Sequence, residues 1–137
     1  MQMNYPIKII LAWGESISGN SKIRDWLIKN GYSELGLFSF ALRNEDKARE
    51  WLINNKFPHL MALINASEGN VQAQKWLKQH NYELLLWISL AADNSEEALK
   101  KLEQLPQKEW SIIALKIRAV KNKIERDNND IHKISKT

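Results

Sequence analysis

Apolar residues recur along this chain at a fixed interval of 25 positions. The tryptophans of "RDWLIKNGY", "REWLINNKF" and "QKWLKQHNY" are Trp26, Trp51 and Trp76. Further columns keep the same spacing without gaps: Leu27, Leu52, Leu77 and Leu102; Tyr32, Phe57 and Tyr82; Ile23, Ala48, Ala73 and Ala98; Leu35, Leu60, Leu85 and Trp110. Self-similarity over so many columns is typical of a protein built from stacked structural repeats.

The first half of each repeat has the spacing of an amphipathic helix. Ile23, Trp26 and Leu27 lie at positions i, i+3 and i+4, which share one helical face. Residues that can cap a helix precede these segments: Ser18 or Asn20, then Asn44, Ser67 and Asn94. Gly31 and Asn81 follow the first and third of these helices, where a residue with left-handed backbone geometry is expected.

The second half of each repeat is apolar on nearly all sides, as in "SELGLFSFAL", "PHLMALINA" and "YELLLWISLAA". This pattern predicts a helix packed between neighbours rather than a helix with one wet face. A buried strand is the alternative, because leucine-rich repeats of about 20–29 residues pair a strand with a helix. Leu, Met and Ala outnumber β-branched residues in these segments, which favours the helix.

The two ends differ from the repeats. "YPIKIILAWGES" reads as a lone second helix with Tyr5 in the aromatic column and a two-residue insertion after it. "KEWSIIALKIRAVKNKIERDNND" begins as a second helix and continues past the repeat length. Atypical first and last units are what a stacked array needs to cover its exposed core faces.

We therefore predict an all-α protein, a right-handed α-solenoid of short helix pairs with N- and C-terminal capping helices. About four repeats span 19–43, 44–68, 69–93 and 94–118 within a single domain at 1–127, followed by a flexible basic tail at 128–137. The helix pairs resemble the α-solenoid class that includes HEAT and leucine-rich-repeat-variant proteins. This resemblance implies a scaffold or a partner-binding surface and assigns no functional residue.

Composition and charge narrow the possible functions. The chain has 137 residues and no Cys, which excludes disulfides and cysteine nucleophiles and suits a cytoplasmic protein. The apolar run Ile9–Trp13 is too short for a membrane span. Basic and acidic residues balance at 13 each before residue 114, whereas residues 114–137 hold seven basic and three acidic residues. The net charge of +4 therefore belongs to the C-terminal segment.

Candidate catalytic and metal sites are weak. Asp25 and Glu50 occupy equivalent positions in adjacent repeats, but Lys75 continues their column, which indicates a solvated face rather than an acid/base pair. The histidines lack the spacing of metal ligands, and we expect His59 and His80 to be surface or capping residues. No phosphate-binding loop or serine-hydrolase motif occurs. We therefore predict that the protein is not an enzyme and has no catalytic residues, cofactor or metal.

The tryptophan column and the C-terminal helix are the remaining candidates for binding. The tryptophans could form a stacking ladder for a ligand, but their shared face with Ile23, Ala48 and Ala73 favours a structural role between helix pairs. In the C-terminal helix, Trp110, Ile113, Ile117, Val120 and Ile124 form an apolar stripe among basic residues. A capping helix, a homodimerisation helix and a polyanion-binding surface are the alternatives for it.

These patterns favour a module that binds another protein through exposed helix faces. The candidate contacts on the first helices are Arg24, Asp25, Arg49, Glu50 and Lys75. The alternative function is RNA or DNA binding through the C-terminal helix, where the candidate residues are Lys116, Arg118, Lys121, Lys123 and Arg126.

Overall fold

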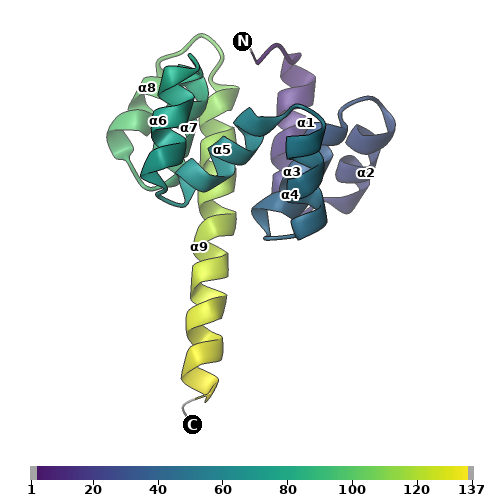
Figure 1. The fold of residues 1–137 in the computed structure, drawn as a ribbon. Helices are drawn as coiled ribbons and strands as arrows, with labels where there is room; N and C mark the ends of the chain where they lie inside the picture. Colours follow the sequence, from purple (N-terminus) through teal and green to yellow (C-terminus); the bar gives the residue numbers. More distant parts are fainter. Residues whose placement is uncertain (1–2, 136–137) are drawn as a thin grey trace.

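The computed structural model describes residues 3–135, with side chains described through residue 128. These residues form nine helices (Figure 1): α1 (Ile7–Ile17), α2 (Ser21–Lys29), α3 (Ser33–Leu42), α4 (Asp46–Asn54), α5 (Pro58–Ser67), α6 (Val71–Gln79), α7 (Glu83–Ala92), α8 (Glu96–Glu103) and α9 (Glu109–Ser135). The segments that could have been strands lie within α3 and α7, so the all-α prediction is confirmed.

The end of α9 leaves the other helices and extends away from them (Figure 1). Its backbone remains helical to Ser135, while residues 136–137 lie outside the described part of the chain. Most side chains of the predicted tail at 128–137 are likewise outside the description. The flexibility of that tail therefore stays a prediction.

The helix boundaries follow the 25-residue period, although three of the predicted caps are wrong. Asn20 caps α2 as expected, and its side-chain oxygen accepts a hydrogen bond from the backbone N–H of Ile23. The N-caps of α4, α6 and α8 are Glu45, Asn70 and Ser95 rather than Asn44, Ser67 and Asn94. Asn44 and Asn94 instead end the preceding helices with positive φ angles of 68° and 74°. Asn tolerates this geometry better than most residues, which explains its use there.

The same column of stop residues corrects the predicted start of the array. Gly19, with φ of 106°, stands 25 positions before Asn44 and has the same role at the end of α1. Ile10 and Trp13 then fall in the columns of Leu35 and Phe38, and all four side chains are fully buried. Helix α1 therefore belongs to the regular period, and the predicted two-residue insertion is wrong.

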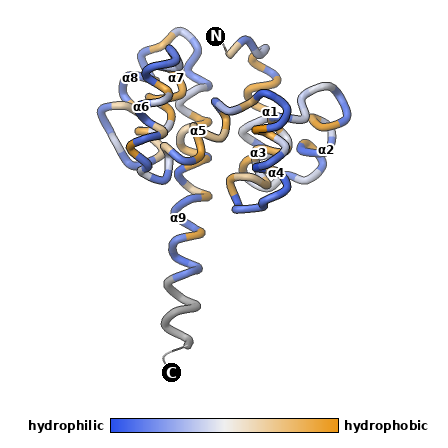
Figure 2. The backbone as a smooth tube through the Cα atoms, in the orientation of Figure 1, coloured by the Kyte–Doolittle hydropathy of each residue, from blue (hydrophilic) through white to orange (hydrophobic). Residues whose placement is uncertain are grey.

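The helices divide into an inner and an outer set. The inner helices are α1, α3, α5, α7 and α9, and each of them packs against the next one. The outer helices are α2, α4, α6 and α8, and each of them packs on the two inner helices that flank it in the chain. Figure 2 shows that hydrophobic residues concentrate on the inner set, while the outer helices and their loops are mostly hydrophilic.

The inner helices form a closed ring, because α9 also packs against α1. The predicted helix pairs are present, but an open solenoid is not confirmed, since the first and last inner helices of a straight array would not meet. The closure removes the two exposed core faces that the predicted capping helices were expected to cover. Within the described residues, α1 and α9 cover each other.

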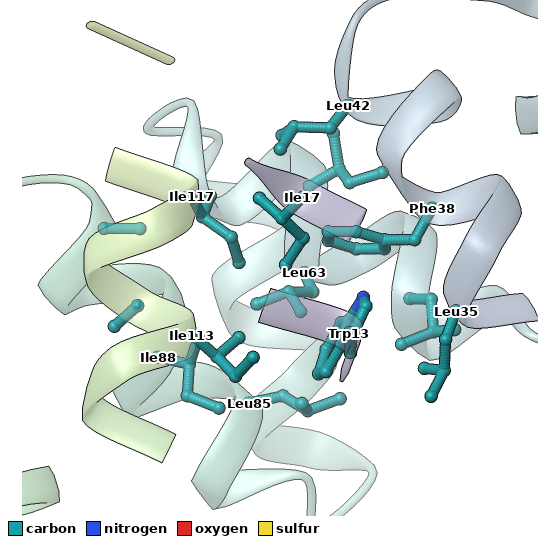
Figure 3. Packing of buried hydrophobic residues seen from close by; sticks show 14 of the residues in the cluster. Trp13, Ile17, Leu35, Phe38, Leu42, Leu63, Leu85, Ile88, Ile113 and Ile117 are labelled. Carbon is teal, nitrogen blue, oxygen red and sulfur yellow. The ribbon is translucent and has the colours of Figure 1, made fainter. Parts of the chain in front are cut away.

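A single repeat column fills the centre of this ring. Trp13, Phe38, Leu63, Ile88 and Ile113 each come from a different inner helix and are fully buried. Figure 3 shows their side chains converging, and the rings of Trp13 and Phe38 meet edge to face at 5.1 Å between centroids. Such edge-to-face pairs stabilise by about 0.5–1.5 kcal/mol beyond the area they bury. The 25-residue period thus places one side chain from each repeat in one layer of the core.

Candidate protein-binding surfaces

The predicted contact residues on the outer helices have two different roles. Asp25, Glu50 and Lys75 are exposed and available to a partner. Arg24 and Arg49 instead connect an outer helix to its neighbours. The guanidinium of Arg24 lies 4.4 Å above the ring of Phe40 in α3.

Arg49 makes more contacts within the fold than Arg24 does. Its Nε donates to the carbonyl oxygen of Ala41 at 2.9 Å, and its Nη2 donates to Oδ1 of Asn44 at 2.8 Å. The same guanidinium lies 3.6 Å from a carboxylate oxygen of Glu68. Because these contacts join α4 to the ends of α3 and α5, Arg49 serves the fold in this structure.

Some of the predicted basic residues on α9 likewise make contacts within the fold. Arg118 donates to the carbonyl oxygen of Ala91 at 3.0 and 2.7 Å, and its Nη1 lies 3.2 Å from Glu96. Lys121 is buried, and its Nζ donates to Asp93 at 2.7 Å. The charged groups of these two α9 residues lie against the C-terminal end of α7, where the helix dipole favours cations.

The other three predicted α9 residues differ from these two. Lys116 is half-buried, and its stem packs against Gly14 of α1. Lys123 and Arg126 are exposed. The structure therefore leaves two exposed cations among the five predicted ones. Lys123 lines a hollow with Asn44, to which Arg49 donates a hydrogen bond, so the two predicted groups approach each other there.

The repeated Trp-Leu pair separates into a buried and a half-buried column. Leu27, Leu52, Leu77 and Leu102 are fully buried, so the leucine is the joint between helices. Trp26 is 48% exposed, while Trp51 and Trp76 are half-buried. Trp51 stacks on Phe57 at 5.9 Å, and Trp76 stacks on Tyr82 at 5.8 Å. The predicted structural role is thus fulfilled mainly by the leucines, while the tryptophans remain partly exposed.

His59 connects the aromatic pairs of two neighbouring repeats. Its ring stacks on Tyr82 at 5.0 Å and meets Phe57 at 5.9 Å with a tilt of 47°. The side chain is 2% exposed, so the prediction of a surface histidine is wrong. Burial lowers the pKa of His59, which favours the neutral imidazole. The sequence could have indicated this burial, because His59 lies next to the aromatic repeat column of Phe57 and Tyr82.

An apolar groove lies between α4 and α6 and has a volume of about 420 Å³. Figure 1 shows these two outer helices on either side of α5, which forms its floor. The lining includes Ile53 of α4, Met61, Ala62 and Asn65 of α5, and Ala73 and Trp76 of α6. Ile53 is 58% exposed, the largest exposed fraction among the large apolar side chains of the described residues.

The sequence explains why the surface of α5 is lowered in this open groove. Ala62 stands in a column that holds Ala12 in α1, Leu37 in α3, Trp87 in α7 and Ile112 in α9. The next outward column has Asn65 where α3, α7 and α9 have Phe40, Leu90 and Leu115, and α1 has Glu15. Small and polar residues at these two positions remove side-chain volume from the surface of α5. Sequence reasoning missed the groove, although Ala62 is visibly smaller than Leu37 and Trp87 at the same position of the two neighbouring inner helices.

Two further hollows lie where α9 leaves the ring. A cavity of about 270 Å³ is lined by Leu42, Ser67, Lys121 and Ile124, and an adjoining one of about 480 Å³ is lined by Arg43, Lys116 and Lys123. Arg43 is held there by hydrogen bonds to the carbonyl oxygens of Ile17 and Ser39. The described residues include no group of His, Cys, Asp and Glu that could hold a metal ion. None of the described helices is long and apolar enough to cross a membrane.

Comparisons of this chain with protein-family models, curated proteins and solved structures find no match. The fold itself defines the class of protein, which is an all-α helical array of sequential helix pairs. Any functional inference depends on the surfaces described above.

Proposed function

We propose that this chain is a non-enzymatic helical-repeat module that binds an apolar segment of a partner protein in the groove between α4 and α6. The observation that supports this proposal most strongly is the combination of exposed Ile53 with the reduced side chains of Ala62 and Asn65. Apolar surface that is both concave and exposed marks interaction sites in soluble proteins. A helical ligand in such a groove would present apolar residues along one face.

Trp76 is the expected anchor of this contact. It lines the groove, is half-buried and is already held by stacking on His80 and Tyr82. A rigid aromatic side chain loses little conformational entropy on binding, which is why Trp is enriched among the residues that dominate interfaces. Exposed Asp46 and Lys75 lie on the same two outer helices, outside the residues that line the groove, and could supply polar contacts at its edge.

The test uses substitutions that fill the groove or place a charge in it. The measurement is the amount of partner protein that each variant captures from the native cell lysate. Ala62→Trp copies the residue that α7 carries at Trp87 and should fill the groove. Ala62 is only 8% exposed, so thermal unfolding of this variant is measured beside Ile53→Asp, whose position is exposed. Ile53→Asp places a charge in the groove at an exposed position. Val71→Asp is the matched control, because Val71 is 57% exposed on α6 but does not line the groove.

We expect a partner that wild type and Val71→Asp capture equally and that both groove variants lose by at least about tenfold, the usual effect of disrupting an interface anchor. Circular dichroism and thermal unfolding of each variant verify the fold. Equal capture by Ala62→Trp, Ile53→Asp and wild type would contradict the proposal. A photo-crosslinker at position 53 should also label the same partner directly.

The alternative function is polyanion binding by the part of α9 beyond the ring, where Lys123 and Arg126 are exposed. Deleting this region from Val120 onward would also remove buried Val120 and Lys121, so paired substitutions are a cleaner test. If Lys123→Glu with Arg126→Glu abolished RNA or DNA binding that also weakened steeply with salt, the alternative would replace the main proposal. We further propose the cytoplasm as the location, consistent with the absence of Cys.

A further inference from the structure

The ring has five junctions between neighbouring inner helices, but the described residues supply outer helices for only four of them. Helix α2 packs on α1 and α3, α4 on α3 and α5, α6 on α5 and α7, and α8 on α7 and α9. At the fifth junction α9 packs directly against α1, and no described helix lies over the pair. We call this junction the vacant position.

On the α1 side, the vacant position exposes a residue from a column that elsewhere contacts an outer helix. Leu11 stands 25 positions before Gly36. A Cβ atom at Gly36 would lie 2.6 Å from Cγ1 of Ile28 and 3.0 Å from the carbonyl oxygen of Arg24, so this column faces the preceding outer helix. No described outer helix precedes α1, and Leu11 is 44% exposed.

On the α9 side, the corresponding residue comes from the column that faces the following outer helix. Ile112 shares its column with Trp87, whose ring lies 5.6 Å from Nζ of Lys101 in α8. Ala62 of the same column lines the groove with Ala73 and Trp76 of α6. Helix α9 has no following outer helix, and Ile112 is 39% exposed.

These two sides meet where α1 and α9 pack together. A Cβ atom at Gly14 of α1 would lie 4.0 Å from Cγ2 of Ile112, so the helices touch at the base of the vacant position. Ile7 and Leu115 add exposed fractions of 50% and 43% on the same two helices. Four of the seven large exposed apolar side chains among the described residues thus belong to α1 and α9.

We propose that the vacant position binds one amphipathic helix of a partner protein that has the pattern of this chain's own outer helices. That pattern is a small or aliphatic residue followed three and four positions later by a large apolar residue and Leu, as in Ala48, Trp51 and Leu52. The occupant follows from the repeat itself, because the four equivalent junctions each hold an outer helix of 8–9 residues. Three of these helices have the whole pattern, and α8 keeps Ala98 and Leu102 but has Lys101 in place of the large apolar residue. The inference goes beyond the proposed function, since it concerns a different surface.

A second copy of this chain is a less suitable occupant. Its outer helices already bury their leucines, Leu27, Leu52, Leu77 and Leu102, completely against their own ring. A second copy could therefore supply the pattern only by releasing a helix from its own core. A face-to-face dimer of two vacant positions is the other arrangement, and the experiment below distinguishes it.

The probe is a synthetic peptide of residues 44–56, "NEDKAREWLINNK", stapled into a helix through the exposed positions of Asp46 and Glu50. Stapling is needed because an isolated helix of this length is marginal in water. The peptide is titrated into the methyl-labelled full chain and followed by NMR. The control peptide carries Leu52→Asp, which removes the residue that packs on the inner helices.

We expect saturable shifts of the methyl signals of Ile7, Leu11, Ile112 and Leu115, and none with the control peptide. Leu11→Asp and Ile112→Asp should each weaken binding by at least about tenfold. Both positions are exposed, so these variants should remain folded. Ala62→Trp should leave peptide binding unchanged, which separates this site from the groove between α4 and α6.

Three outcomes would overturn the inference. The first is the absence of saturable shifts up to about 1 mM peptide, which corresponds to negligible affinity. The second is a set of shifts centred on α3 and α5, which would mean that the peptide replaces α4. The third is a dimer in sedimentation experiments that Leu11→Asp converts to a monomer, which would make a second copy the occupant.

Discussion

Two neighbouring columns of the repeat behave in opposite ways. The inward column Trp13, Phe38, Leu63, Ile88 and Ile113 is large, apolar and fully buried in all five inner helices. The outward column contains Ala12, Leu37, Ala62, Trp87 and Ile112, which differ widely in size and exposure. The inward column must fill the closed centre of the ring, because protein interiors are close-packed. The outward column can vary, and each change creates a different surface, such as the groove at Ala62.

The largest test of this contrast uses two adjacent residues of α3. Phe38→Ala removes a fully buried ring from the central layer and should cost about 3–5 kcal/mol of unfolding free energy. Leu37→Ala removes a half-buried side chain from the outward column and should cost about 1 kcal/mol or less. Urea unfolding of both variants measures the difference. Equal losses would show that the outward column is part of the core.

A smaller effect concerns a polar residue at a buried position of the inner helices. Burial lowers the pKa of His59 below the ordinary value of 6.5, which favours the neutral imidazole in the folded state. As the pH falls through 6.5, the unfolded chain binds a proton at this position before the folded chain does, so stability declines. Above 6.5 the contribution of His59 to stability is fully present.

His59→Phe keeps a ring between Phe57 and Tyr82 and removes the titration. The decline of the melting temperature between about pH 7 and pH 5 should therefore be shallower in this variant than in the wild type. Thermal unfolding followed by circular dichroism at a series of pH values measures both slopes. His80→Phe is the matched control, because His80 also stacks on an aromatic ring, that of Trp76, but is exposed. Identical slopes for wild type and His59→Phe would show that His59 does not contribute.

The sequence predicted the elements of this fold well, because its repeat columns correspond to layers of packing. The columns of Leu27 and Leu35 are buried throughout, and the helix pairs follow the 25-residue period. The start of the array was harder to recognise. Tyr5 resembles the aromatic column but lies two residues before the matching position, Ile7, whereas the positive φ angles at Gly19 and Asn44 show the true register of α1.

Ring closure could not be predicted from the period alone. A period gives the number of residues in each unit, whereas closure depends on the angle between consecutive inner helices, which the packed side chains determine. Central side chains as different in shape as Trp13 and Leu63 adjust that angle in ways that a column of letters does not encode. The vacant position follows from closure and was invisible for the same reason.

The predicted binding residues fared unevenly because many partners of charged side chains are backbone atoms. Arg49 and Arg118 look like free surface cations in the sequence, yet both donate to carbonyl oxygens at helix ends. No side-chain pattern identifies such acceptors. The groove, in contrast, could have been predicted from the sequence, since Ala62 is much smaller than Leu37, Trp87 and Ile112 of the same column.

The contact between α1 and α9 tests the closed ring most directly. A Cβ atom at Gly14 would lie 3.5 Å from Cδ1 of Ile113, so the α-protons of Gly14 and the δ1 methyl of Ile113 are close neighbours. A nuclear Overhauser experiment on the full chain should therefore show a strong cross-peak between them. In an open solenoid α1 and α9 would lie at opposite ends, and the absence of this cross-peak in a folded sample would contradict the ring and with it the vacant position.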